Sequence, residues 1–516
     1  MQEVPHHALT ESQTKGPSRI SIQTIPHRLT ENVYTEHPVL TCFLISSTEL
    51  SSDYGTMQHP SPQWRIYGGH RLSGTITTNG SKNSALAIIS ASLLTFEPIL
   101  LTNVPRISDV NDMVSILRSM GTQATWEDNN LSLQRPLILD VESLDIQAAQ
   151  RTRAVVLLVA GLAIHHVDFT VPLPGGCDLG DRSLEPHIDA LEQLGLEVSH
   201  QSNGLRVRRT EESAPETTIA LTESGDTVTE NAILTAVALN RGVVRICNAS
   251  CNYMVQDLCS FLQQISGVSI EGLGSPQLTI RRCEPGTPGP ITYPILPDPI
   301  EAFFFIAAAV VTRSCLRVQS VPVTFIALEL RLLQKMGLTV RMGPQYASAS
   351  GVTMLCDLDI LADHHPLSAM DSKIHPNIYP FGVNVDNLPA FGPIAAVSEG
   401  QTLLHDWMYE QRAPYFALLR DFGVQVELPD KHRAYVHGPT ELKAADFRLP
   451  PALRPASMIL LAALAAPGMS YLNNVDVISR GYEELVGRLR SIQARVEVLD
   501  VKADQQMPEG VIRSVM

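Results

Sequence analysis

The first candidate for chemistry is a lysine at the start of a helix. Residues 78–86 (TNGSKNSAL) place Lys82 and Asn83 where a glycine turn opens an apolar helix. A helix N-terminus presents free backbone N–H groups and the positive end of the helix dipole, which suit an anion. Because an isolated lysine at this place is more often a solvated residue of the first turn, the motif alone makes an anion site a hypothesis.

The second candidate is a cysteine in an irregular loop. Residues 172–182 (PLPGGCDLGDR) hold three glycines and two prolines around Cys177, and loops of this kind often carry function. An arginine such as Arg182 near an exposed thiol favours the thiolate, so Cys177 could act as an acid or a nucleophile. A cysteine that merely occupies a turn fits the same residues.

A set of arginines and one aspartate complete the candidates. Arg153 and Arg454 open apolar helices, where a lone charge is costly unless it has a partner. Guanidinium groups bind carboxylates and phosphates through paired N–H donors. Asp386 precedes another apolar helix and could serve as a general base, although such an aspartate is more often an N-cap. The placement at helix starts favours one anion site shared by Arg153, Arg182, Arg412, Arg454 and Arg480.

The elements that carry these residues recur six times. An amphipathic helix, with apolar residues three and four positions apart, predicts one buried face. A glycine that suits a left-handed C-cap follows every copy except the sixth. Each copy leads into a predicted hairpin, such as Leu196–His200 with Leu205–Arg208. The six helices span residues 112–121, 187–195, 256–267, 328–337, 415–423 and 482–493.

A second helix precedes each amphipathic one. It is apolar on nearly all sides, which is typical of complete burial. The repeating unit is therefore a buried helix, a strand, a surface helix and a hairpin, roughly 70–85 residues long. This mixture predicts an α/β protein, and we favour two lobes of three units over a solenoid. The buried helices begin at Asn83, Arg153, Glu230, Glu301, Leu388 and Arg454.

In these motifs the chain resembles the enolpyruvyl transferases, and among them those that act on UDP-N-acetylglucosamine. The cysteine loop is the most specific motif, since the related synthase of the shikimate pathway lacks it. The resemblance implies a two-lobed, inside-out α/β barrel fold of six βαβαββ-type repeats, with the active site between the lobes. It rests on residues 81–86 (SKNSAL), 173–182 (LPGGCDLGDR), 296–301 (LPDPIE), Asp386, 453–457 (LRPAS) and 480–483 (RGYE).

The resemblance also implies domain boundaries and a reaction. Residues 81–296 would form the lobe with the cysteine loop, and residues 63–80 with 297–503 the second lobe. The enolpyruvyl group of phosphoenolpyruvate would pass to the 3-hydroxyl of UDP-N-acetylglucosamine with release of phosphate, the first committed step of peptidoglycan precursor synthesis. Neither a metal nor an organic cofactor is expected.

The roles implied by the resemblance follow the motifs. Asp386 would accept the proton of the sugar hydroxyl, and Cys177 would be the general acid or the covalent partner of the enolpyruvyl carbon. The catalytic set would be Cys177, Asp386, Lys82, Arg454 and Arg480. The substrate-binding set would be Lys82, Asn83, Arg153, Arg182, Asp386, Met408 and Arg412.

Four departures from the family pattern leave alternatives open. Ala452 stands where the family usually has an aspartate. Pro299 follows the aspartate of the LPD motif, where the family often has an arginine, and residues 252–254 (NYM) replace an acidic segment. The stretch 224–231 matches the nucleotide-binding part poorly. The alternatives are transfer to another uridine nucleotide in specialised metabolism, and a catalytically inactive paralogue that only binds.

Composition excludes some classes of protein. The net charge of -15 among 516 residues argues against a partner nucleic acid. The longest apolar runs, Ala302–Val311 and Ala456–Ala466, are too short to span a membrane. The scattered cysteines and the absence of a secretory signal predict a cytoplasmic protein. We expect a monomer or a weak homo-oligomer. Residues 1–62 are expected to be a disordered extension, with Met57 a plausible start, and residues 504–516 a tail.

Overall fold

The computed structural model describes residues 62–175, 183–210, 215–239, 242–283, 289–363 and 367–499. The predicted N-terminal extension, except for its last residue, and the predicted C-terminal tail lie outside these ranges. Among the described residues, no helix is both long and apolar enough to cross a membrane.

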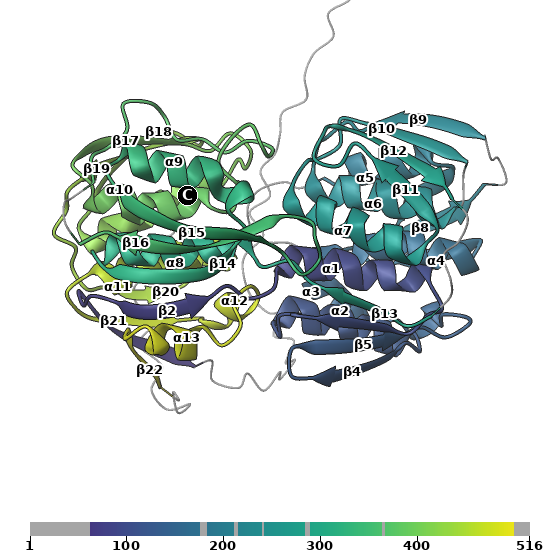
Figure 1. Cartoon of the computed structure of the whole chain (residues 1–516), viewed down its shortest axis with the longest axis horizontal. Coiled ribbons are helices and arrows are strands. Elements are labelled where there is room, and N and C mark those ends of the chain that lie inside the picture. The colour runs from purple at the N-terminus through teal and green to yellow at the C-terminus, as the bar shows by residue number, and fades with distance from the viewer. Residues whose placement is uncertain are drawn as a thin grey trace, which may run out of the picture. The chain divides into compact units, whose positions relative to one another are not determined.

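The strands of the described ranges form six sheets, one for each repeat (Figure 1). The first three sheets have the strand orders β13 (Ile291–Pro294), β3 (Ile99–Thr102), β5 (Asn130–Gln134), β4 (Gln123–Glu127); then β6 (Asp168–Val171), β8 (Gly204–Arg209), β7 (Leu196–Gln201); and β9 (Glu216–Ala220), β10 (Val243–Cys247), β12 (Gln277–Arg282), β11 (Val268–Glu271). The other three are β2 (Ser73–Thr77), β14 (Cys315–Val321), β16 (Met354–Leu361), β15 (Thr339–Ala347); then β17 (Gly400–His405), β19 (Arg433–Gly438), β18 (Gln425–Asp430); and β20 (Asp446–Arg448), β21 (Gly468–Asn473), β1 (Gln63–Gly68), β22 (Arg495–Leu499).

The sheets share one pattern of pairing. Each contains antiparallel neighbours, and each four-stranded sheet adds one parallel pair at its edge. Three strands pair far from their place in the chain. Strand β1 inserts between β21 and β22, β2 pairs with β14, and β13 pairs with β3. Pairing between such distant segments leaves no trace in local periodicity.

The helices fall into the two predicted kinds. The apolar set is buried along almost its whole length, and in one member, α8, all residues are buried. This set comprises α1 (Lys82–Ala91), η3 (Arg153–Leu158) with α4 (Val159–His165), α6 (Asp226–Ala238), α8 (Pro299–Val311), η5 (Leu388–Ala390) with α10 (Phe391–Val397), and α11 (Leu453–Ala465). The amphipathic set comprises α2 (Ser108–Ser119), α5 (Glu185–Gln193), α7 (Tyr253–Ile265), α9 (Ala327–Lys335), η6 (Ala413–Phe422) and α13 (Leu485–Ser491).

The remaining helices are short: η1 (Ser92–Leu94), η2 (Val141–Ser143), α3 (Ile146–Arg151), η4 (Val323–Ile326) and α12 (Asp476–Ser479). The fifth amphipathic helix, η6, is a 3-10 helix and not the expected α-helix, with a proline in its first turn. The α/β class and the six repeating units predicted from the sequence are confirmed.

Two separate hydrophobic cores enclose the apolar helices (Figure 1). The first, here the N-terminal core, runs from Ala85 to Ile300 and includes Phe325. The second, the C-terminal core, joins residues 64–76 to residues 302–496. We propose that these cores are the two lobes expected from the resemblance.

The chain passes between the two cores twice, and the two passages are bonded to each other. The Ser81 N–H donates to the Leu296 carbonyl at 2.7 Å, and the Asp298 N–H donates to the Asn79 carbonyl at 2.8 Å. Gly80 lies between them, and a Cβ there would come within 1.7 Å of the Asn103 carbonyl oxygen, so this close approach requires glycine. The passage leads directly into α1 and Lys82.

Candidate active site

Lys82 is the first residue of α1 and points into a group of charges. Ser81 caps the helix, since its hydroxyl accepts from the Ser84 N–H at 3.2 Å. The Lys82 Nζ lies 2.6 Å from the Asp109 Oδ2. The neighbouring Asn83 places its Nδ2 3.3 Å from the Tyr253 hydroxyl, at the first residue of α7.

Asp109 connects two of the predicted site residues. It lies in the first turn of α2, with its side chain only 6% exposed. Its Oδ1 accepts from the Arg480 Nε at 3.0 Å, while its Oδ2 holds Lys82. Burial alone would raise the pKa of Asp109, but the charges of Lys82 and Arg480 outweigh it and hold the pKa below its ordinary value. Asp109 therefore joins a cation of each core.

Asp386 has a similar pair of cationic neighbours. The Arg454 Nε lies 3.1 Å from its Oδ2, and the Arg412 Nη1 lies 4.0 Å from its Oδ1. Burial opposes ionisation, yet Arg454, Arg412 and Lys82 together lower the pKa of Asp386. The carboxylate is therefore charged at neutral pH and able to accept a proton from a ligand.

Arg454 is the second residue of α11 and is buried. Its Nη1 donates to the Tyr482 hydroxyl at 3.2 Å, in addition to its contact with Asp386. Burial by itself would lower the pKa of Arg454, but the charge of Asp386 reverses the effect and raises it. A buried guanidinium needs such partners, because an unpaired charge away from water is very costly.

Arg412 has unused hydrogen-bonding capacity. Its side chain is 1% exposed, and its Nε donates to the buried Asp406 carboxylate. Among the described residues, its Nη1 and Nη2 have no hydrogen-bond partner. Since buried donors are almost always satisfied, these two groups are suited to a ligand. Met408 precedes Arg412 in the same segment and is partly buried.

The contacts thus bring together six of the ten predicted site residues. The group that we call the charged cluster consists of Lys82, Asn83, Asp386, Arg412, Arg454 and Arg480, with Asp109. The Arg153 Nη2 donates to the Ser183 carbonyl at 3.1 Å. Cys177 and Arg182 lie outside the described residues. The roles assigned to individual residues stay predictions.

Sequence reasoning missed Asp109. An acidic residue in the first turn of an amphipathic helix usually favours the helix dipole from a solvated position. Only the fold shows that this carboxylate is buried between Lys82 and Arg480. Arg480 lies 371 positions further along the chain than Asp109. Tyr482 lies within the quoted RGYE motif, but its contact with Arg454 had no separate signal.

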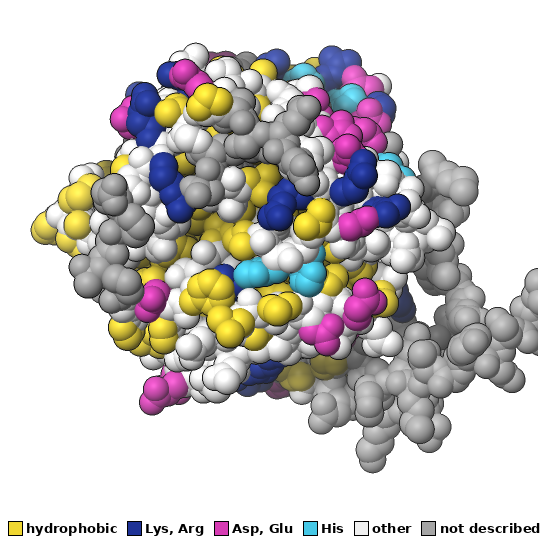
Figure 2. Space-filling model, turned by 90° about the vertical axis from the view of Figure 1, so that its right-hand side faces the viewer, with side chains coloured by type: hydrophobic (Ala, Val, Ile, Leu, Met, Phe, Trp, Pro, Cys, Tyr) yellow, Lys and Arg dark blue, Asp and Glu magenta, His cyan; other side chains and the backbone are white. Residues whose placement is uncertain are grey.

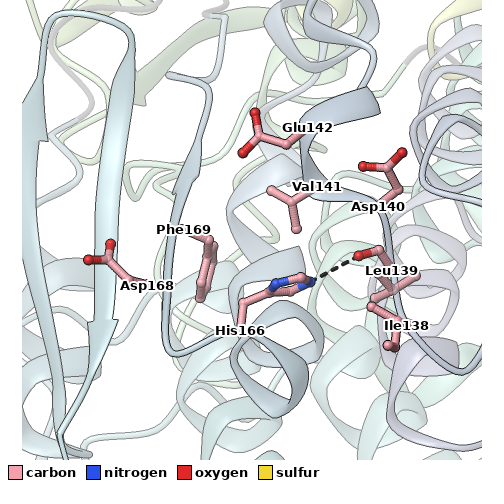
Figure 3. A pocket seen from close by; sticks show the side chains of 8 residues that line it. All are labelled: Ile138, Leu139, Asp140, Val141, Glu142, His166, Asp168 and Phe169. Carbon is pink, nitrogen blue, oxygen red and sulfur yellow. Dashed lines mark hydrogen bonds between the residues drawn. The ribbon is translucent and has the colours of Figure 1, made fainter.

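A surface pocket of about 390 Å³ lies apart from the charged cluster (Figure 3). It shares no residue with the cluster, and two of its carboxylates already have partners, Asp140 with Ser143 and Asp168 with Arg206. His166 in its middle contacts the Leu139 carbonyl at 3.0 Å. Figure 2 shows one face of the molecule, where hydrophobic side chains border a pair of histidines and several Lys and Arg side chains lie above them. The pocket therefore offers no competing set of reactive groups.

The charged cluster can hold a small polyanion and move a proton. Lys82 and Arg480 hold one carboxylate, and Arg454 and Arg412 hold another, Asp386. The charge of Lys82 also reaches Asp386, so the two ion-paired groups are neighbours. Among the described residues, no three His, Cys, Asp or Glu side chains are arranged to hold a metal ion. Positioning of an anion beside a base is the core of group transfer from a phosphorylated donor.

Comparison with known proteins defines the class. The model of the family EPSP synthase (3-phosphoshikimate 1-carboxyvinyltransferase) matches residues 66–397. The chain belongs to this family of enolpyruvyl transferases and is a carboxyvinyl transferase. It is 36% identical to the UDP-N-acetylglucosamine 1-carboxyvinyltransferase of Bradyrhizobium diazoefficiens, over 84% of this chain and 97% of that protein. It is 33% identical to the protein of that name in Treponema pallidum, over 84% and 98%.

Solved structures show the same fold. The enolpyruvyl transferase NikO from Streptomyces tendae superposes with a TM-score of 0.73 at 23% identity, covering 85% of this chain and 99% of that one. EPSP synthase from Acinetobacter baumannii superposes with a TM-score of 0.66 at 15% identity, covering 85% and 100%. The predicted enolpyruvyl transferase fold is therefore confirmed.

Proposed function

We propose that the protein transfers the enolpyruvyl group of phosphoenolpyruvate to the 3-hydroxyl of UDP-N-acetylglucosamine and releases phosphate. The charged cluster carries the proposal, because Lys82, Arg454 and Arg480 surround the ionised carboxylates of Asp109 and Asp386. Relatives named UDP-N-acetylglucosamine 1-carboxyvinyltransferase, matched over nearly their whole length, support the acceptor. The product would enter peptidoglycan synthesis.

In this proposal the cations hold the phosphate and carboxylate of phosphoenolpyruvate. Lys82, Arg454 and Arg480 lie in the charged cluster, and Arg182 would join them from the cysteine loop. Fixed positive charges stabilise the phosphate as it leaves and cost no reorganisation during the reaction. The unused Nη groups of Arg412 offer further donors to a substrate oxygen.

Asp386 acts as the base in the proposed addition. It takes the proton of the sugar 3-hydroxyl as that oxygen forms a bond to C2 of phosphoenolpyruvate, and Cys177 supplies the proton that C3 gains. Loss of a proton from C3 and departure of phosphate then restore the double bond. Acid–base catalysis of this kind accelerates a reaction by a factor of about 10²–10⁴.

The cysteines of the described residues are all free, which fits a reducing compartment. The proposal therefore places the reaction in the cytoplasm.

Phosphate release by the purified full-length protein tests the proposal. Phosphoenolpyruvate is supplied with UDP-N-acetylglucosamine, and with UMP in a parallel reaction. Release with the UDP-sugar is expected, with a loss of about 10²-fold or more in Cys177→Ala and in Asp386→Asn. Cys283→Ala is the matched control, because Cys283 is an exposed free cysteine at the end of β12. Release only with UMP would overturn the acceptor, and silence with both would overturn the proposal.

A further inference from the structure

Asp226 is a carboxylate that none of the roles above uses. It is the first residue of α6 and is partly exposed. Its Oδ1 accepts from the Ser250 hydroxyl at 2.6 Å, and its Oδ2 accepts from the Asn252 Nδ2 at 3.1 Å. An ionised carboxylate offers about four acceptor positions, so these two bonds fix its orientation and leave acceptor capacity for a ligand.

Contacts trace a short path from Asp226 to the charged cluster. Asn252, which holds Asp226, is the N-cap of α7 and is followed by Tyr253. The Tyr253 hydroxyl lies 3.3 Å from the Asn83 Nδ2, next to Lys82. The starts of α1, α6 and α7 therefore lie close together. Asn83 belongs to the substrate-binding set that the family resemblance implies.

Asp386, from the other core, lies within electrostatic range of Asp226. Burial raises the pKa of Asp226, the bonds from Ser250 and Asn252 oppose the rise, and the nearby charge of Asp386 adds to it. Tyr253 likewise lies within reach of the charges of Asp386 and Arg454. Two carboxylates that repel each other across a site are costly when nothing lies between them.

A neutral ligand relieves this repulsion when it donates hydrogen bonds to both carboxylates. Sugar hydroxyls do so, whereas a phosphate or carboxylate beside Asp226 would add a like charge. We infer that Asp226 determines specificity for the acceptor, by accepting hydrogen bonds from hydroxyl groups of its sugar while Asp386 takes the reacting hydroxyl. This inference rests on the proposed function.

The test compares a sugar-bearing ligand with one that lacks the sugar. Asp226→Ala and Asp226→Asn are examined by titration calorimetry with UDP-N-acetylglucosamine and with UDP, and by steady-state kinetics. Asp226→Ala is expected to weaken UDP-N-acetylglucosamine binding at least tenfold and to leave the Kd of UDP and the KM of phosphoenolpyruvate within twofold. Asp226→Asn, which keeps one acceptor oxygen, is expected to lose about threefold.

Glu223→Gln is the matched control, since Glu223 is an exposed carboxylate three residues before Asp226. It removes a neighbouring charge that also acts on Asp226, but none of the proposed hydrogen bonds to the sugar, so both affinities should stay within twofold. Unchanged binding in both Asp226 variants would overturn the inference, as would equal losses for UDP and for the UDP-sugar. Tighter UDP binding in Asp226→Ala would show instead that the carboxylate repels the diphosphate. If the wild-type protein itself fails to bind and turn over UDP-N-acetylglucosamine, the proposed function falls and the inference falls with it.

Discussion

A single carboxylate, Asp109, balances two cations that a substrate anion would also use. Its two oxygens hold Lys82 and Arg480 at 2.6 and 3.0 Å. Asp386 does the same for Arg454 and Arg412. The positive charges of the cluster thus have internal partners before any ligand arrives. Such pairing offsets the repulsion between the buried cations. An anionic substrate that enters would therefore join ion pairs that already exist.

Asp109→Asn should lower the free energy of unfolding by about 1–3 kcal/mol at pH 7, because it leaves two cations without their shared partner. The pKa of Asp109 is lower in the folded protein than its ordinary value of 3.8. Its contribution to stability is therefore complete above the unfolded pKa and is lost as the pH falls through the folded pKa. Urea unfolding at pH 7 and at pH 3 should show the difference narrowing at the lower pH.

Asp112→Asn is the control for this measurement. Asp112 lies on the same helix, α2, but its partner Arg151 is 56% exposed, so the pair should contribute at most about 1 kcal/mol. A difference for Asp109→Asn that is no larger than this, or that persists undiminished at pH 3, would contradict the role of Asp109.

At the scale of elements, the ends of the amphipathic helices obey one backbone rule. The five glycines predicted to end them all have positive φ: Gly121 at 96°, Gly195 at 84°, Gly267 at 57°, Gly337 at 109° and Gly423 at 88°. The sixth helix lacks the glycine, yet Gln493 takes the same left-handed conformation, with φ of 69°. The repeat therefore imposes its geometry on a residue that disfavours it.

Gln493→Gly should relieve this strain and stabilise the protein by about 0.5–1 kcal/mol. The left-handed conformation costs a residue with a side chain about 1–2 kcal/mol. Glycine recovers only part of this, because it gives the unfolded chain more conformational entropy. Urea unfolding measures the change. Ser491→Gly, within the last turn of α13, should instead destabilise by a similar amount. Equal effects of the two substitutions would exclude strain at Gln493 as the cause.

The elements also show what the sequence could predict. Apolar spacing located both helix sets, because burial of one face or of all faces is written in each segment. The 3-10 form of η6 was not predictable in this way, since apolar spacing does not separate it from an α-helix. Motifs pointed to several members of the charged cluster, for example Lys82 and Arg454, whose roles stay predictions. Asp109 and Asp226 were not predicted as site residues, because only the folded chain shows that they lie near charges from distant segments.

At the scale of the whole described unit, two contacts join the cores beside the charged cluster. Arg480 reaches Asp109, and three residues later both Glu483 carboxylate oxygens contact the Asn129 Nδ2, at 3.0 and 2.8 Å. Asn129 is held to the N-terminal core by exchange of backbone and side-chain bonds with Val104. The segment that carries Arg480 is thus attached at two points to the opposite core.

Asn129→Ala should remove one of these attachments without touching the charges that hold substrate. Arg480 would then be held less firmly, so we expect a loss of about 1–2 kcal/mol in transition-state stabilisation. This loss corresponds to a fall of roughly five- to thirty-fold in kcat/KM for phosphoenolpyruvate. The KM for phosphoenolpyruvate should carry most of the loss, since Arg480 is expected to bind this substrate. Asn130→Ala is the control, because it also removes a side-chain amide, one residue further along at the start of β5. It should leave kcat/KM unchanged. A loss of equal size in both variants would place the effect in the hairpin itself, and unchanged kinetics in Asn129→Ala would show that the Arg480 contact alone is enough to hold this segment for catalysis.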